Sequence, residues 1–260
     1  MDKEQFWQII DDARTSAGTW NEMCEPLVET LSKLEIEDIM LWDKIFSEYM
    51  MHSYTTGLLA TDAIMYNGCS DDGFEYYRNW LIAQGKEVYM KALADPDSMP
   101  DLEAVRALAL EVTASEFVPI EGYKNGVRFE EIMFAAHDAI ELKYDLAQSK
   151  WDFTLIDRFR NTPLTAEVSA EILRDIPGHA KATAIKGGES LEWVHNSDAL
   201  KQLLPRVYSA FRSEEMSPQE RDSPVMKLPE KESLAQKLAR GKQAAAQNKS
   251  EPKSPGEHGL

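Results

Sequence analysis

The chain has 260 residues, 43% of them hydrophobic, and its 45 acidic and 28 basic side chains give a formal net charge of −17. This apolar fraction is enough to bury a core, which excludes a wholly disordered chain. No run of eighteen apolar residues occurs, and the first residues lack the pattern of a secretory signal, so we expect no membrane-spanning segment and no export. Because Cys24 and Cys69 are the only cysteines, no disulfide framework is needed, and the expected location is cytoplasmic.

The negative charge is concentrated in the first part of the chain. Residues 1–154 contain 12 basic and 30 acidic side chains, whereas residues 155–211 contain seven of each. We therefore expect three units, at 1–150, 155–211 and 212–260. The last unit has no aromatic side chain and is predicted to be disordered. Because an acidic first unit without a basic stripe repels a phosphate backbone, nucleic acid is not an expected partner.

The first unit is predicted to be entirely α-helical, because its apolar residues recur every three or four positions. In residues 36–52 the apolar stripe consists of Ile39, Trp42, Phe46 and Tyr49. Further helices are expected over these ranges: 3–14, 21–33, 54–66 and 102–113.

Residues 129–147 have the same period and predict one more amphipathic helix. His137 lies between its two faces and is interpreted as a boundary histidine rather than a general base. The acidic residues assigned to the polar face are Glu130, Glu131, Asp138, Glu141 and Asp145.

The neutral unit has a different pattern. Thr165 is expected to cap a helix that ends before a Pro-Gly pair. Two short segments, 180–186 and 189–194, flank two consecutive glycines, which predicts a β-hairpin. A helix over 197–211, bent or broken at Pro205, follows. The predicted fold class is thus mainly α: an all-α N-terminal domain, a small α+β module of helix, hairpin and helix, and a disordered C-terminal tail.

The segment from Asn67 to Tyr89 combines turn residues, paired acids and five aromatic side chains. Asn67 and Gly68 are expected to end one helix, and either Ser70 or Asp72 to cap the next. The helix that follows is apolar over a wide arc, so we expect it at the centre of the bundle.

Together with Phe6-Trp7-Gln8-Ile9-Ile10 near the start and residues 94–99 after it, this segment resembles an uncharacterised bacterial family, domain of unknown function 4240. The resemblance covers roughly residues 1–125. Its most specific part runs from Gly68 to Gln84, where the chain shows no departure from the family pattern. The resemblance implies a helical domain and a bacterial origin. It implies no reaction and supplies no catalytic residue.

Two interpretations of the start of this helix remain open. In the functional one, Asp71, Asp72 and Glu75 gather around a cleft, Arg78 holds an anionic ligand, and Trp80 is a candidate lining residue. In the structural one, Asp71 and Asp72 satisfy free backbone N–H groups and the helix dipole, and Arg78 pairs with Glu75 or another nearby acid.

Cys69 is interpreted as a small buried residue, because adjacent acids would raise the pKa of its thiol.

No motif for a specific chemistry is present. The five histidines include no pair at i and i+4, and there is no phosphate-binding glycine loop and no nucleophile elbow, so no metal site, cofactor or catalytic residue is assigned. The preferred hypothesis is a non-catalytic interaction or regulatory protein that binds a protein partner. The alternative is an enzyme, or a small-ligand or metal binder, that uses the acidic cluster with Arg78.

Overall fold

The computed structural model describes residues 1–19, 22–114, 126–145, 153–187 and 190–212, and all statements below concern these residues. The α-helices are α1 (Lys3–Ser16), α2 (Cys24–Ser32), α3 (Ile36–His52), α4 (Thr56–Tyr66), α5 (Asp71–Ala83), α6 (Lys86–Ala94), α7 (Glu103–Ala114), α8 (Ala135–Tyr144), α9 (Phe153–Asn161), α10 (Ala166–Asp175), α11 (Gly178–Ala182), α12 (Ser197–Leu203) and α13 (Pro205–Phe211). Short 3₁₀ helices η2 (Pro96–Asp101), η4 (Glu131–Phe134) and η6 (Glu192–His195) lie between them. Among the helices described, none combines the length and apolar character needed to cross a bilayer.

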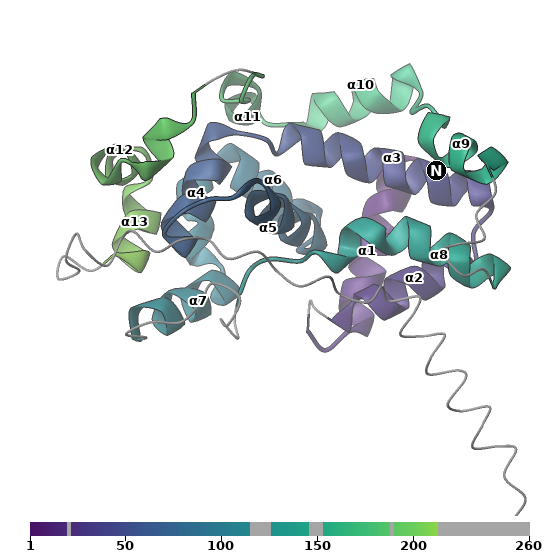
Figure 1. Cartoon of the computed structure of the whole chain (residues 1–260), viewed down its shortest axis with the longest axis horizontal. Helices are drawn as coiled ribbons and strands as arrows, with labels where there is room; N and C mark the ends of the chain where they lie inside the picture. The colour runs from purple at the N-terminus through teal and green to yellow at the C-terminus, as the bar shows by residue number, and fades with distance from the viewer. Residues whose placement is uncertain (20–21, 115–125, 146–152, 188–189, 213–260) are drawn as a thin grey trace, which may run out of the picture.

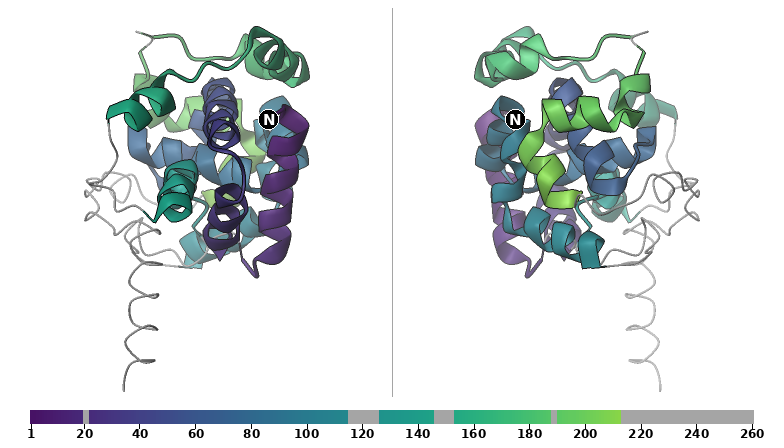
Figure 2. Two further views of the ribbon diagram at one scale, coloured as in Figure 1. Left: turned by 90° about the vertical axis from the view of Figure 1, so that its right-hand side faces the viewer. Right: turned by 90° about the vertical axis from the view of Figure 1, so that its left-hand side faces the viewer.

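Helix α3 connects two groups of helices (Figure 1). At one end, α2 packs against α1 and α8, and α8 also contacts α3. At the other end, α4 and η2 pack against each other and against α13, and α5 contacts both α4 and α6. Helix α10 packs against α3. Helices α12 and α13 pack on α4 and face the viewer in the right-hand view of Figure 2.

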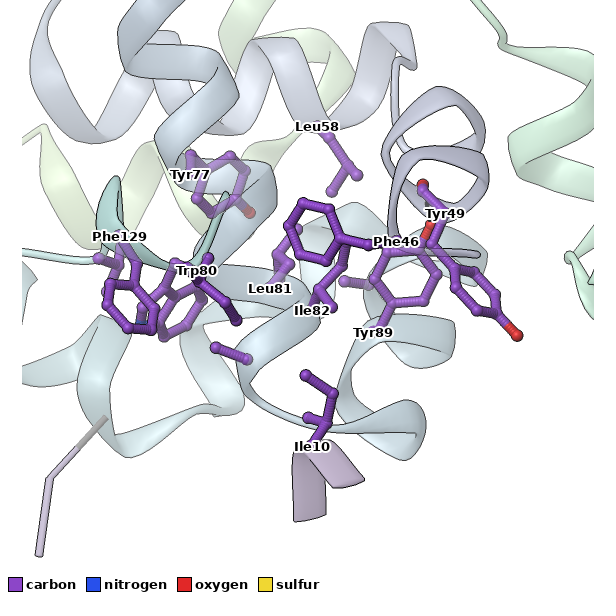
Figure 3. Close-up of a cluster of buried hydrophobic side chains, with 14 of the residues drawn as sticks. Ile10, Phe46, Tyr49, Leu58, Tyr77, Trp80, Leu81, Ile82, Tyr89 and Phe129 are labelled. Atoms are coloured by element: carbon purple, nitrogen blue, oxygen red, sulfur yellow. Dashed lines mark hydrogen bonds between the residues drawn. The ribbon is translucent and has the colours of Figure 1, made fainter. Parts of the chain in front are cut away.

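The core is one continuous cluster of buried side chains drawn from α1 to α13. Its aromatic members include the ring pairs Tyr49–Tyr89, with centroids 5.5 Å apart, and Tyr77–Trp80, with centroids 6.2 Å apart (Figure 3). Contacts of this kind stabilise a core beyond the area they bury. Trp80 is fully buried among them, which confirms the central place expected for α5.

The sequence patterns locate several elements correctly. Helix α3 has the predicted limits, and its predicted apolar stripe is buried. Asn67 ends α4 in the left-handed conformation, with φ of 54°. Ser70 caps α5, and Thr165 caps α10. The last predicted helix breaks at Pro205, where α13 begins.

The predicted polar face of residues 129–147 is wrong at two of its five acids, Asp138 and Glu141, whereas Phe129, Ala136 and Ile140 of the apolar face are buried as predicted. Asp138 and Glu141 are only 2% and 3% exposed, whereas Phe134 and Tyr144 are 43% and 48% exposed. The segment is not one α-helix, because residues 131–134 form η4 and α8 begins only at Ala135. Helix α8 packs against both α2 and α3, so it is buried over a wider arc than the pattern predicts, and this arc includes Asp138 and Glu141.

The predicted β-hairpin is not confirmed, and the described residues contain no strand. Residues 178–182 form α11 and residues 192–195 form η6. Ala184 makes an isolated antiparallel bridge with Thr55 instead of pairing within its own segment. The segment therefore satisfies its backbone groups on the junction between α3 and α4. Part of the predicted turn, at residues 188–189, and the predicted tail beyond Arg212 lie outside the described residues.

The helices after α9 contribute to the same core as the first part of the chain. Val207 and Phe211 of α13 are fully buried. The backbone N–H groups of Arg206 and Val207 each donate to Asp97 Oδ1 at 2.9 Å, so a side chain of η2 caps α13. Division of the chain into units that fold separately remains a prediction.

Candidate anion-binding site

The start of α5 is built by local hydrogen bonds. Ser70 Oγ accepts the backbone N–H of Gly73 at 3.0 Å, so Ser70 is the cap. Asp71 and Asp72 follow in the first turn, where their negative charge is favourable next to the free N–H groups of the helix. Both acids are exposed.

The five candidate residues predicted from sequence lie in different environments. Asp71 lines a cavity of about 340 Å³ beside Cys69. Asp72 is exposed, Glu75 is half-buried, and Trp80 is fully buried in the core. Only Arg78 lines the larger cavity described below. That all five bind one ligand together stays a prediction.

Arg78 is held by carbonyl groups and aromatic rings. Its Nη1 donates to Met50 O at 2.8 Å, and its Nε donates to Phe74 O at 3.3 Å. The guanidinium carbon lies 5.1 Å from the ring centroid of Tyr54 and 4.7 Å from that of Phe74. Burial lowers the pKa of Arg78, and the charge of Glu75 partly opposes this effect. An arginine nevertheless stays protonated in proteins, so the site holds a permanent positive charge.

No carboxylate of the described residues forms an ion pair with this guanidinium. The predicted pairing of Arg78 with Glu75 is therefore not formed. Charges withdrawn from water are ordinarily paired, so a half-buried arginine that is held by carbonyls and rings alone can still accept an anion.

Arg78 faces a cavity of about 390 Å³ between two parts of the chain. One wall comes from the α3–α4 junction and α5, and the other comes from the segment around α11. The lining residues are Met51, His52, Tyr54, Arg78, Ile176, Ala180, Lys181, Ala184 and Ile185.

Backbone hydrogen bonds fix the second wall against the first. The N–H of Thr56 donates to Thr183 O at 2.9 Å, and the N–H of Ile185 donates to Tyr54 O at 3.0 Å. The hydroxyl of Thr56 also donates to Thr183 O, at 3.1 Å. These bonds bring Lys181, on the preceding turn, to the cavity that Arg78 lines.

His52 is the third nitrogen-bearing side chain of the cavity. Its Nε2 lies 3.5 Å from Glu48 Oε1, which also accepts the hydroxyl of Ser169 at 2.7 Å. Burial lowers the pKa of His52, the positive charge of Lys181 lowers it further, and Glu48 opposes both effects. His52 and Lys181 therefore act on each other electrostatically across the cavity.

Cys69 does not have the properties of a reactive thiol. Burial raises its pKa, and the nearby Asp62 carboxylate raises it further, with a smaller effect from Asp71. The predicted direction of the pKa shift is confirmed, and the thiol stays protonated at neutral pH.

The cavity can bind an anion chemically. A guanidinium, an ammonium and an imidazole are donors suited to carboxylate or phosphate oxygens, and Arg78 can offer two parallel N–H bonds to one such group. Tyr54, Ile176 and Ile185 provide apolar contacts for the rest of a small ligand.

Sequence reasoning identified only one of the three polar groups. His52 is not part of any recognisable sequence motif. Lys181 lies far from His52 in the sequence, in a segment of mixed charges. Tertiary contacts of residues 54–56 with residues 183–185 bring them together. No local spacing in the sequence carries that information.

A model for the family described as "Protein of unknown function (DUF4240)" matches residues 1–141 of the chain. The match includes the wall that carries His52 and Arg78 and ends before the wall that carries Lys181. Searches of curated proteins and of solved structures returned no match.

Proposed function

The chain belongs to the DUF4240 family, and from this starting point we propose that it is a non-catalytic binding protein with a regulatory role, which takes up a small anionic ligand at Arg78. The observation that carries the proposal is a half-buried guanidinium with no carboxylate partner among the described residues, facing a cavity that His52 and Lys181 also line.

The composition of the cavity supports binding over chemistry. Among the described lining residues there is no serine, threonine, cysteine, aspartate or glutamate. The cavity thus combines donors for an anion with apolar walls, and its described lining offers no hydroxyl of serine or threonine, thiol or carboxylate as a nucleophile.

The two-part construction of the cavity supports regulation. A ligand between Arg78 and Lys181 would join α5 to α11 and strengthen the docking of residues 176–185 on the α3–α4 junction. A ligand that binds one arrangement better than another shifts the equilibrium between them. The protein partner expected from the sequence belongs to this proposal, because a binding protein without a reaction acts through the molecules it contacts.

The proposal is tested by thermal unfolding of the full chain with inorganic phosphate and with citrate, against sodium chloride at matched ionic strength. A ligand at 100 times its dissociation constant adds about 2.7 kcal/mol to the free energy of unfolding. We expect stabilisation by at least one of the two anions beyond the salt control.

Two lysine variants make the test specific. Lys181→Ala removes one cavity cation, whereas Lys186→Ala removes an exposed lysine that does not line the cavity. We expect the first to weaken anion binding about tenfold and the second to leave it unchanged. Equal effects of the two substitutions, or no stabilisation beyond that of sodium chloride, would contradict the proposal.

A further inference from the structure

The inward side of α8 carries a second polar cluster, separate from the cavity. His137, Asp138 and Glu141 lie at positions i, i+1 and i+4 of the helix. His137 Nδ1 is 3.7 Å from Asp138 Oδ1 and 3.7 Å from Glu141 Oε1, and the three ligand atoms all lie within 4.8 Å of one another. Three side chains with metal-ligating atoms therefore converge on one point.

The two carboxylates of this cluster are buried on α8, a helix that packs against α2 and α3. Asp138 Oδ1, the oxygen that points toward His137 Nδ1, accepts no hydrogen bond, and no lysine or arginine of the described residues pairs with Asp138. A buried carboxylate oxygen without a donor is unfavourable, because the hydrogen bonds that it makes to water in the unfolded chain are not replaced in the folded protein. A cation at this point would offset that loss.

The lysines on these helices are engaged elsewhere. Lys44 Nζ lies 3.2 Å from Asp43 Oδ2 and 5.3 Å from the ring centroid of Phe159. Lys143 Nζ donates to Leu34 O at 2.7 Å. Asp43 on α3, a half-buried carboxylate paired with Lys44, also interacts electrostatically with His137.

We propose that His137, Asp138 and Glu141 bind a divalent transition-metal ion. Two ligands of one ion, each about 2.1 Å from it, can be at most about 4.2 Å apart, so the 3.7 Å separations are compatible with a shared ion after small side-chain rotations. An imidazole with two carboxylates suits manganese, iron, cobalt or zinc, whereas magnesium and calcium favour oxygen ligands alone.

This site is independent of the proposed anion cavity. All three ligands are on α8, near the middle of α3, whereas the cavity lies at the C-terminal end of α3. The ion would neutralise buried charge at the contact of α8 with α2 and α3 and so stabilise this half of the bundle.

The experiment uses the full chain, freed of metal with a chelator and titrated with manganese chloride by calorimetry. We expect one equivalent of Mn²⁺ to bind and to raise the midpoint of thermal unfolding. Asp138→Asn and His137→Gln should each weaken binding at least tenfold. Asp72→Asn, which removes an exposed carboxylate on α5, should bind Mn²⁺ as the wild type does.

Circular dichroism separates loss of the site from loss of the fold. His137 is partly exposed, so the His137→Gln variant should keep wild-type helix content. If Asp138→Asn unfolds the protein, Mn²⁺ binding by the His137→Gln variant alone tests the proposed site. Absence of stoichiometric Mn²⁺ binding by the wild type, or wild-type affinity in a folded His137→Gln variant, would overturn the proposal. Anion binding should be unaffected in both variants, which keeps this test distinct from that of the cavity.

Discussion

Arg128 forms an ion pair with Asp62 of α4 in which one guanidinium nitrogen contacts both carboxylate oxygens. Arg128 Nη2 lies 2.9 Å from Asp62 Oδ1 and 3.0 Å from Oδ2, and the guanidinium carbon lies 3.8 Å from the ring centroid of Tyr66. Asp62 is completely buried, and burial raises its pKa although the charge of Arg128 opposes that shift. The pair therefore fixes the segment before η4 onto α4 at an electrostatic cost.

The absence of a side chain at Gly73 leaves room for the guanidinium of Arg128. A Cβ atom at position 73 would lie 2.6 Å from the guanidinium carbon of Arg128. We predict that Gly73→Ala lowers the free energy of unfolding by about 1–2 kcal/mol, because the guanidinium must leave its place against Asp62. In an Arg128→Ala background the same substitution should be neutral or stabilising by up to about 1 kcal/mol, since alanine is the better helix former. Urea unfolding of the four proteins measures this coupling, and equal effects of Gly73→Ala in both backgrounds would contradict it.

Removal of one partner of the pair should be more harmful than removal of both charges. Arg128→Ala leaves a carboxylate buried without its cation, so we expect a loss of about 3–5 kcal/mol. Adding Asp62→Asn should recover a large part of this loss, because the unpaired charge is then gone. Chemical denaturation of both variants provides the measurement. The explanation is wrong if the double variant is no more stable than Arg128→Ala alone.

Asp97 links the family-matched region to the last described helix. Because its carboxylate accepts the backbone N–H groups of Arg206 and Val207, Asp97→Ala should cost about 1–2 kcal/mol. Asp95→Ala, two residues earlier and exposed, is the control and should have little effect on stability. Thermal unfolding compares the two. A loss confined to Asp95→Ala would mean that the cap does not stabilise α13.

The sequence predicted those features that depend on neighbouring residues. The limits of α3, the cap at Ser70 and the break at Pro205 follow from local periodicity and local hydrogen bonding. The DUF4240 resemblance over residues 1–125 is confirmed and extends to residue 141.

The features that were missed depend on contacts between distant parts of the chain. Ala184 pairs with Thr55, which no pattern within residues 180–194 could indicate. The burial of Asp138 and Glu141 results from the packing of α8 on two other helices. The sequence pattern places Asp138 and Glu141 on a polar face and gives no sign that they are buried. From the sequence alone, the proposed metal ligands therefore look like ordinary surface acids.

His52 is expected to make the free energy of unfolding decrease as the pH falls, because its pKa is lowered in the folded protein. Burial and the charge of Lys181 keep its pKa below the ordinary value of 6.5, against the effect of Glu48. Between its lowered pKa and pH 6.5 the unfolded chain therefore binds more protons than the folded one. The contribution of neutral His52 is fully present above pH 6.5 and is lost as the pH falls toward the folded-state pKa, with a slope of at most about 1.4 kcal/mol per pH unit.

Comparison with His52→Gln isolates this contribution, because other titrating groups are common to both proteins. We expect the difference in the free energy of unfolding between wild type and variant to shift in favour of the variant as the pH is lowered from 7.5 to 5.5. Phosphate bound in the cavity should reduce this shift, since an anion beside His52 favours its protonated form. A difference that stays constant over this range would show that His52 has the same pKa in the folded and unfolded chain.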